Sequence, residues 1–335
     1  MLGLLLFPRD VSLAVRDGIS LCTDTLFPAL FPFLVLSGFL VKSGLAQQIA
    51  RPLEKFAGTL FGLPGVCISA LTLGLIAGYP TGVKAAVELY REGYCTRQEA
   101  ERMLSFCNNC GPGFLISGIG CGLFGSVRSG MLLYAVHLIA AVLTGFIFKL
   151  RNSHSFSPSN HHQTNTYHSY SSFVLSVTES MFSFLNLAAF VLCFSAISRL
   201  VQLSGILNIL SALLPISREN APYFLLGLLE MTNGALNLLG GTLSERMFLA
   251  AALIGWGGLS VHCQVLSLLQ DTDLSPTWYF RGKALHAFLC ALITSALLGV
   301  LQIRYFIIIL CFFTTVLFFR KKAVEKKRKV YYNAS

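Results

Sequence analysis

The sequence of 335 residues is 54% hydrophobic and only 12% charged, and its formal net charge is +10. A soluble domain carries about twice that share of charged residues, and several apolar runs here reach the roughly 20 residues that a helix needs to cross a bilayer. The composition therefore excludes an ordinary soluble protein. Because the runs are continuous, it also excludes a membrane β-barrel, whose strands alternate over about 10 residues. We expect an all-α polytopic protein embedded in a lipid bilayer.

The positive charge is concentrated in "RKKAVEKKRK", residues 320–329, directly after the last apolar run. Basic residues beside a membrane helix mark its cytoplasmic end, so the C-terminus is predicted to be cytoplasmic and no nucleic-acid partner is expected. The sequence contains no GxxxxGK[ST] phosphate loop, which excludes an ATP-driven motor of that type.

In chain order, the sequence starts with "MLGLLLFP", which is too short to span a bilayer and lacks the basic residues of a signal peptide. Near the middle, "RNSHSFSPSNHHQTNTYHSYSS" is almost free of aliphatic residues and is predicted to be a flexible hydrophilic linker. The predicted organisation is an N-terminal stub or interfacial segment (1–19), a first repeat (20–150), the linker (151–172), a second repeat (173–300), a C-terminal transmembrane helix (301–319) and a basic cytoplasmic tail (320–335).

The two halves match each other in four stretches that occur in the same order. For example, "GLIAGYPTGVKAA" (74–86) falls on "GLLEMTNGALNLL" (227–239), and "LYAVHLIAAVLTG" falls on "GKALHAFLCALIT", with His137 on His286. Basic residues follow the first-half helix at 128–148, whereas Arg281 and Lys283 precede its second-half counterpart at 284–300. The charges therefore predict two inverted repeats, an architecture of secondary transporters whose binding site lies at the repeat interface near the bilayer midplane.

Each half contains a predicted re-entrant hairpin. Residues 66–80 cover about 22 Å as a helix, which is short of a full crossing, and Pro80 with its neighbouring glycines ends that helix. We place the tip at residues 78–82, with Thr81 capping the next helix. The counterpart is 221–240, with its tip at 230–234.

Each half also contains a predicted broken helix. Residues 96–106 form a helix with Thr96 as N-cap and Glu99 at the capping-box position. The helix is interrupted at 108–113 by "NNCGPG" and then resumes; the counterpart of this break is 257–262. Unwound backbone is tolerated at membrane depth only where protein or a water-filled cavity surrounds it.

The hairpin tips and breaks predict a site for a small anion. Half-helix N-termini at about Gly82, Gly113, Gly234 and Ser260 present free N–H groups and the positive end of the helix dipole. Lys84 either adds a positive charge or lies at the surface with its stem along the lipid. The candidate substrate-binding residues are Gly78, Tyr79, Pro80, Thr81, Gly82, Lys84, Asn108, Asn109, Gly111, Gly113, Thr232, Asn233, Gly234, Gly257, Gly258 and Ser260.

Two further residues are candidates for coupling or gating, namely Glu230 and His262. An intramembrane carboxylate is costly and usually functional, although Glu230 can equally cap a helix. His137 and His286 are expected to be core histidines with satisfied hydrogen bonds, with a proton relay as the alternative.

Cys107-x-x-Cys110 raises the possibility of a redox or zinc site. A structural zinc site needs four ligands, and the sequence holds no second CxxC. We therefore expect no catalytic residues, no metal and no cofactor, and the protein is not expected to be an enzyme.

The stretches "TLFPALFPFLVLSGFL", "AGYPTGVKAAVELYREG" and "AERMLSFCNNCGPGFL" resemble the sporulation integral membrane proteins of the YlbJ (SpoVV) family. The resemblance covers nearly the whole chain, and "GYPTG" and "FCNN-x-GP" are its most specific part. It implies a duplicated gate-type "nucleoside recognition" domain, expression in the mother cell of a spore-forming bacterium, and transport of dipicolinic acid across the outer forespore membrane. The family is expected to carry serine at the position of Cys110, so the CxxC spacing is interpreted as incidental.

The breaks and hairpin tips predict a transporter or facilitator that moves a small anion. The resemblance implies that this anion is dipicolinic acid and that it moves from the mother cell toward the forespore. One alternative is a non-transporting membrane scaffold for assembly of the spore envelope. The other is a gate-type nucleoside transporter. Protein partners are left open.

Overall fold

The computed structural model describes residues 2–43, 45–150 and 169–299. The predicted C-terminal transmembrane helix (301–319), the basic tail (320–335) and most of the predicted linker (151–172) lie outside the described residues. The last four residues of that predicted linker belong to the start of a long helix.

Every regular element of the described chain is a helix, which confirms the predicted all-α class. By length and hydropathy, four helical stretches in this part of the chain can cross a membrane: Pro8–Leu40, Val127–Leu150, Ser171–Leu203 and Leu243–Leu269. A fifth is possible if the pair Pro52–Phe61 and Gly65–Ala77, bent by 98°, counts as one broken span. The protein is therefore an integral membrane protein.

The helices of the first half are α1 (Leu2–Leu6), α2 (Pro8–Ser20), the π-helix η1 (Leu21–Leu26), α3 (Phe27–Lys42), α4 (Leu45–Phe56), the π-helix η2 (Ala57–Phe61), the 3-10 turn η3 (Gly65–Cys67), α5 (Ile68–Ala77), α6 (Thr81–Arg91), α7 (Arg97–Met103), the π-helix η4 (Gly113–Leu123) and α8 (Val127–Leu150). Those of the second half are α9 (Ser169–Leu203), α10 (Ile206–Ala212), α11 (Ala221–Leu229), α12 (Met231–Leu236), α13 (Leu243–Trp256), α14 (Gly258–Leu269) and α15 (Thr277–Leu297).

The first long helix begins earlier than the sequence predicts. Helices α2, η1 and α3 follow one another without a break from Pro8 to Lys42, so most of the predicted N-terminal segment (1–19) belongs to this helix. Pro8 occupies the first helical position, where the missing N–H of proline costs nothing.

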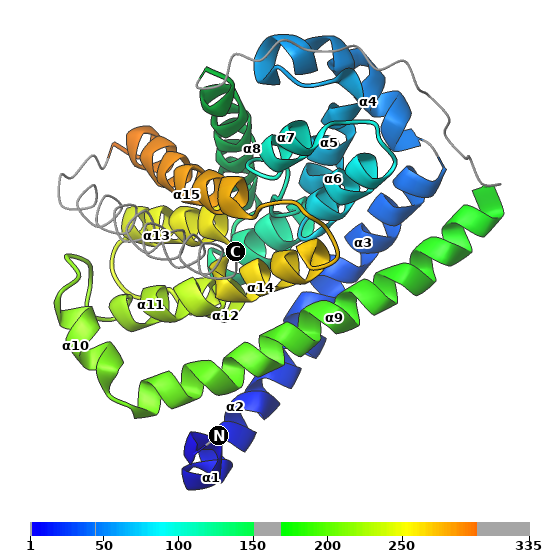
Figure 1. Ribbon diagram of the computed structural model, residues 1–335. Coiled ribbons are helices and arrows are strands. Elements are labelled where there is room, and N and C mark those ends of the chain that lie inside the picture. The colour runs from blue at the N-terminus through cyan, green and yellow to red at the C-terminus, as the bar shows by residue number, and fades with distance from the viewer. Residues whose placement is uncertain (1, 44, 151–168, 300–335) are drawn as a thin grey trace, which may run out of the picture.

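This first long helix runs antiparallel to α9, and the two lie side by side along one side of the molecule (Figure 1). An ion pair joins them near each end. Lys42 Nζ lies 2.7 Å from Glu179 Oε1, and Arg199 Nη2 lies 2.6 Å from Asp10 Oδ1. Outward-facing apolar side chains such as Phe182, which is 69% exposed, are what a lipid-facing helix carries.

The same order of elements occurs in both halves. A long helix (α3 or α9) is followed by a helical hairpin (α5–α6 or α11–α12), a broken helix (α7–η4 or α13–α14) and a second long helix (α8 or α15). The broken helices also start alike. Thr96 caps α7 by accepting a hydrogen bond from the N–H of Glu99, as predicted, and Thr242 caps α13 by accepting one from Glu245. The inverted orientation of the two repeats stays a prediction.

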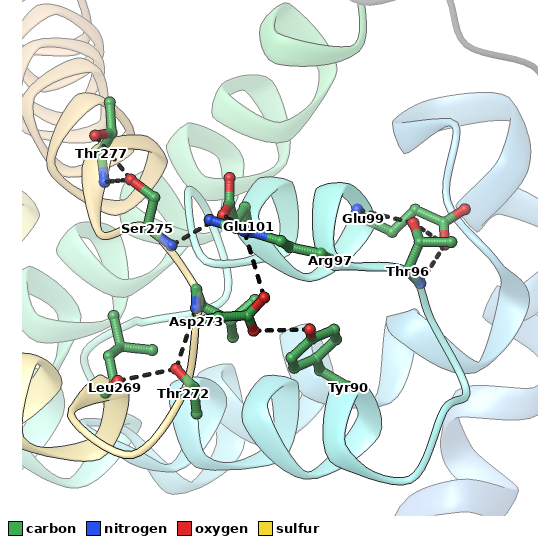
Figure 2. Close-up of polar contacts among 11 residues, drawn as sticks. Tyr90, Thr96, Arg97, Glu99, Glu101, Leu269, Thr272, Asp273, Ser275 and Thr277 are labelled. Atoms are coloured by element: carbon green, nitrogen blue, oxygen red, sulfur yellow. Dashed lines mark hydrogen bonds and ion pairs between the residues drawn. The ribbon is translucent and has the colours of Figure 1, made fainter. Parts of the chain in front are cut away.

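A polar network at the surface ties α6 and α7 to the loop between α14 and α15 (Figure 2). The Tyr90 hydroxyl donates to Asp273 Oδ1 at 2.7 Å, and Arg97 forms ion pairs with both Glu101 and Asp273. Glu101 Oε1 also accepts a hydrogen bond from the Ser275 N–H at 2.9 Å. Because α6 and α7 belong to the first half and the loop to the second, this network links the two halves at the surface.

Glu101 and Asp273 are expected to contribute unequally to this network. The Glu101 side chain is 13% exposed and Asp273 is 57% exposed. Glu101→Ala leaves the Ser275 N–H without its acceptor, so we expect it to lower the free energy of unfolding by about 1 to 3 kcal/mol. Asp273→Asn removes an exposed ion pair and should cost at most about 1 kcal/mol. Denaturation of the two purified variants in detergent compares them, and equal losses would contradict the assignment.

Candidate functional site

The hairpin tips and the helix breaks meet in the middle of the molecule. Gly78, at the first tip, packs so closely on the first break that a Cβ atom would lie 2.8 Å from the Gly111 nitrogen. Gly258, at the second break, would bring a Cβ atom 2.8 Å from the Met231 nitrogen at the second tip. Gly78 and Gly258 have φ angles of 80° and 76°, which glycine adopts without strain. Each hairpin tip therefore lies against the broken helix of its own half.

A cavity of about 60 Å³ lies at this meeting point. Its polar lining comes from both hairpin tips and from α14, and comprises Tyr79, Glu230, Thr232, Ser260 and Gln264. Apolar side chains of α3 and α9 form one wall, and residues of α5, the first break, η4, α12 and α14 complete the lining. Since one water needs roughly 10 to 15 Å³ by this measure, the space holds several water molecules or part of a small polar ligand.

The structure divides the predicted binding residues into two groups. Those that line the cavity are Gly78, Tyr79, Gly111, Gly113, Thr232, Ser260 and the predicted coupling residue Glu230. Those that do not line it are Pro80, Thr81, Gly82, Lys84, Asn108, Asn109, Asn233, Gly234, Gly257, Gly258 and the coupling candidate His262.

Two of the glycines outside the cavity serve close packing. A Cβ atom on Gly82 would lie 1.9 Å from the Cys107 carbonyl oxygen, and one on Gly234 would lie 2.1 Å from the Gly227 Cα. These glycines let the two arms of each hairpin, or a hairpin and a break, approach backbone to backbone. Their pattern in the sequence is the same whether a glycine faces a ligand or a neighbouring chain segment.

Three of the four half-helices begin slightly earlier than predicted. Their first residues are Thr81, Met231 and Gly258, whereas the fourth starts at Gly113 as expected. Thr81 is thus the first helical residue of α6 and not its cap, a position that Pro80 takes.

Glu230 caps helix α12. Its Oε1 accepts a hydrogen bond from the Thr232 N–H at 3.0 Å, and its Oε2 accepts one from the Asn233 N–H at 2.6 Å. The side chain is 3% exposed and lines the cavity. The carboxylate therefore occupies the positive end of α12, which had been predicted to face the substrate.

Because of this capping role, Glu230→Ala is expected to destabilise the protein by about 1 to 2 kcal/mol. Glu230→Asn should recover part of that loss, since asparagine is also a good N-cap. Denaturation of the two variants in detergent measures the difference. Equal stability of Glu230→Ala and the unmodified protein would show that the cap contributes nothing.

A buried lysine that the sequence analysis used only as a marker of sidedness lies beside the cavity. Lys283 on α15 is 1% exposed, and its Nζ lies 3.2 Å from the Asn108 carbonyl oxygen at the first break. The same Nζ is 3.5 Å from the Tyr79 hydroxyl and 5.0 Å from the centre of the Tyr79 ring, over its face. Within the described residues, Lys283 forms no ion pair with a carboxylate.

Other polar groups join Lys283 in this buried region. The Tyr279 hydroxyl lies 2.8 Å from His262 Nδ1 and accepts a hydrogen bond from Asn108 Nδ2 at 3.4 Å. Asn108 Oδ1, Asn109 Oδ1 and His262 Nε2 are buried and have no hydrogen-bond partner among the residues that the structure describes. We call Lys283, Tyr79, Asn108, Tyr279 and His262 the Lys283 cluster.

The sequence carries a signal for the burial of Lys283. Tyr279, Lys283, His286 and Cys290 follow one another at intervals of three or four residues, so they share one face of α15, and all four are buried. By contrast, Lys84, the cation predicted from the sequence, is exposed. Gln264 was also missed; it lies one helical turn after Ser260 and is 3% exposed.

The matched histidines contact each other across the two halves. The rings of His137 and His286 lie 4.4 Å apart, and His286 Nε2 donates to the His137 carbonyl oxygen at 3.1 Å. His137 Nε2 accepts a hydrogen bond from the Cys110 N–H at 2.9 Å, which places the His137 proton on Nδ1, facing Cys290 Sγ at 3.9 Å. Both side chains are thus core histidines with hydrogen-bond partners, as expected.

Those histidines and Cys290 also form a potential metal-ligand cluster, with one ligand atom each within 4.8 Å of one another. The hydrogen bonds argue against a metal there. A metal on His137 Nδ1 would move the proton to Nε2, which already accepts from the Cys110 N–H. Cys107 and Cys110 are both buried free thiols.

The fold and the site together define an integral membrane protein with two helical hairpins and two broken helices around a small cavity. Residues 24–148 match the family model described as "Gate: Nucleoside recognition". The chain is also 27% identical, over 313 residues, to the "Sporulation integral membrane protein YlbJ" of Bacillus subtilis (strain 168), with 85% of this chain and 76% of the relative covered. No solved structure matches. The resemblance predicted from the "GYPTG" and "FCNN-x-GP" motifs is thereby confirmed.

Proposed function

We propose that this protein is a transporter or facilitator for a small anion and not an enzyme. The observation that carries the proposal is the position of Lys283. Its ammonium group is buried beside the meeting point of four chain breaks, and its partners within the described residues are neutral. A buried charge is costly unless it is paired, and ionisable groups within a membrane protein usually mark the path of a substrate. An anionic substrate would supply the counter-charge to Lys283.

The surrounding elements suit such a substrate. Broken helices and hairpin tips meet near the bilayer midplane in secondary transporters that are built from inverted repeats. We propose the same arrangement here, with α3 to α8 and α9 to α15 as the two units. The cavity between the tips would be the entry to the Lys283 cluster.

Within this class, we propose dipicolinate as the substrate and the outer forespore membrane as the location, with transport from the mother cell toward the forespore. The curated relative is named for sporulation, and the family resemblance implies this small dianion. One carboxylate would pair with Lys283.

Uptake by the purified protein in liposomes tests the proposal. We expect labelled dipicolinate to accumulate faster than in protein-free liposomes, and an excess of unlabelled dipicolinate to abolish the signal. Imposed proton or sodium gradients, added one at a time, would identify the coupling ion. The absence of protein-dependent uptake under all gradients would contradict a transport function and favour the scaffold alternative.

The description of the matching family model favours a second candidate substrate, a nucleoside. Labelled uridine provides the comparison in the same liposomes. Uridine uptake that dipicolinate does not inhibit would favour the nucleoside over the anion. We expect the reverse, because a neutral nucleoside leaves Lys283 without a counter-charge.

A further inference from the structure

Tyr79 lies between the cavity and Lys283. It lines the cavity at the tip of the first hairpin, and the face of its ring is covered by Lys283 Nζ at 5.0 Å. Lys283 itself does not line the cavity. A ligand in the cavity therefore meets the Tyr79 side chain before it meets the ammonium group.

The Tyr79 hydroxyl is held by a helix end of the other half. It donates to the Ile254 carbonyl oxygen at 2.6 Å. Ile254 lies in the last turn of α13, which stops at Trp256 because Gly257 adopts a φ of 92°. Carbonyl groups in a last turn have no partner within the helix, so the second break creates the acceptor that holds Tyr79.

We propose that Tyr79 is a closing residue, which separates Lys283 from the cavity until an anion displaces it. This inference takes its ligand, an anion, from the proposed function. The contacts of Tyr79 on which it is based do not depend on that function. In the closed state, Lys283 contacts the ring of Tyr79 by a cation–π interaction. An anion that reaches Nζ replaces this weak contact with a charge pair, and the tyrosine hydroxyl leaves Ile254.

Removing the hydroxyl should therefore favour the open state. Tyr79→Phe keeps the ring over Lys283 but loses the hydroxyl, and with it the 2.6 Å hydrogen bond to Ile254 and the longer 3.5 Å contact from Lys283 Nζ. A neutral hydrogen bond of this kind contributes a factor of about 2 to 10 to an equilibrium. Ligand affinity scales with the fraction of protein that is open, so we expect dipicolinate to bind about 2- to 10-fold more tightly.

Chemical labelling of Lys283 tests the closing role without any substrate. The purified protein is treated with formaldehyde and a borane reductant, and methylation of Lys283 is followed by mass spectrometry. We expect Tyr79→Phe to raise the labelling rate about 2- to 10-fold, and Tyr79→Ala to raise it further. The exposed Lys84 is the internal control and should label at one rate in all variants.

Tyr134→Phe is the matched control variant. The Tyr134 hydroxyl also donates to a helix carbonyl, that of Leu75, at 3.1 Å. Its removal should leave the labelling of Lys283 unchanged. Unchanged labelling of Lys283 in Tyr79→Phe and Tyr79→Ala would overturn the proposal.

The two readouts separate this inference from the proposed function. Faster labelling of Lys283 without any dipicolinate binding would support the closing role and reject the anion. Faster labelling together with weaker dipicolinate binding in Tyr79→Phe would mean that the hydroxyl binds the ligand, and would overturn the closing role.

Discussion

Lys283→Met is expected to reduce dipicolinate uptake at least tenfold. The substitution keeps a long unbranched side chain but removes the charge, and hydrogen bonds to a charged group are worth about 1.5 to 3 kcal/mol. The same substitution should leave the free energy of unfolding nearly unchanged or raise it. A buried charge without a counter-charge is replaced by an apolar group of similar volume, which is often neutral or stabilising.

Lys84→Met is the matched control for this experiment. Lys84 is the lysine that the sequence predicts to bind the anion, but its side chain is exposed. Its substitution should leave uptake unchanged. If the two variants transport equally well, Lys283 does not bind the substrate, and the main support for an anion is removed.

Gly282→Ala is expected to cause a large loss of stability for a single added methyl group. A Cβ atom on Gly282 would lie 1.8 Å from the Ser105 carbonyl oxygen, so α15 and the turn that follows α7 must move apart. Overpacking typically lowers the free energy of unfolding by about 1 to 3 kcal/mol. We expect a loss of about 3 kcal/mol or more, because the obstructing atom belongs to the backbone and cannot rotate away as a side chain can. Thermal unfolding in detergent measures the effect.

Gly122→Ala provides the control for added volume, since the nearest atom to its Cβ position would be 3.8 Å away. This variant should unfold at nearly the same temperature as the unmodified protein. A similar loss in both variants would show that the contact at Ser105 is not decisive. The contact also serves the site, because it brings Lys283, the next residue, to 3.2 Å from the Asn108 carbonyl oxygen.

The elements of the site could be predicted where glycine, proline and asparagine interrupt an apolar run. The first tip at Gly78 and the first break before Gly113 were located in this way, because few other residues explain such interruptions in a membrane helix. Their counterparts at Glu230 and Gly257 followed from the internal match. These signals depend only on neighbouring residues, so a single sequence is enough to detect them.

The charged group of the site could not be predicted with the same reasoning. Lys283 was interpreted as a marker of the inner membrane surface, since basic residues near a helix end usually have that role. The structure starts α15 at Thr277, which places Lys283 two turns inside the helix. A helix start that shifts by a few residues changes a surface charge into a buried one, and the sequence does not fix such starts.

The role of Glu230 was undecided for a related reason. A carboxylate after an apolar helix and before a polar turn fits both a cap and a coupling group. The distances to the Thr232 and Asn233 nitrogens establish the cap. A coupling role stays a prediction that the ion gradients in the liposome assay test.

The glycines around the first break have a mechanical consequence. Gly74 and Gly82, on the two arms of the hairpin, both touch the Cys107 carbonyl oxygen, and Gly282 on α15 touches that of Ser105. Backbone atoms in such contact cannot slide without breaking it, so hairpin, break and α15 form one stiff block. The opposite wall of the cavity, from α3 and α9, consists of apolar side chains such as Leu30 and Leu187, which hold no fixed hydrogen-bond geometry. We therefore expect the cavity to open by a shear movement along the apolar wall of α3 and α9. Lys283 would move together with the block formed by the hairpin, the break and α15.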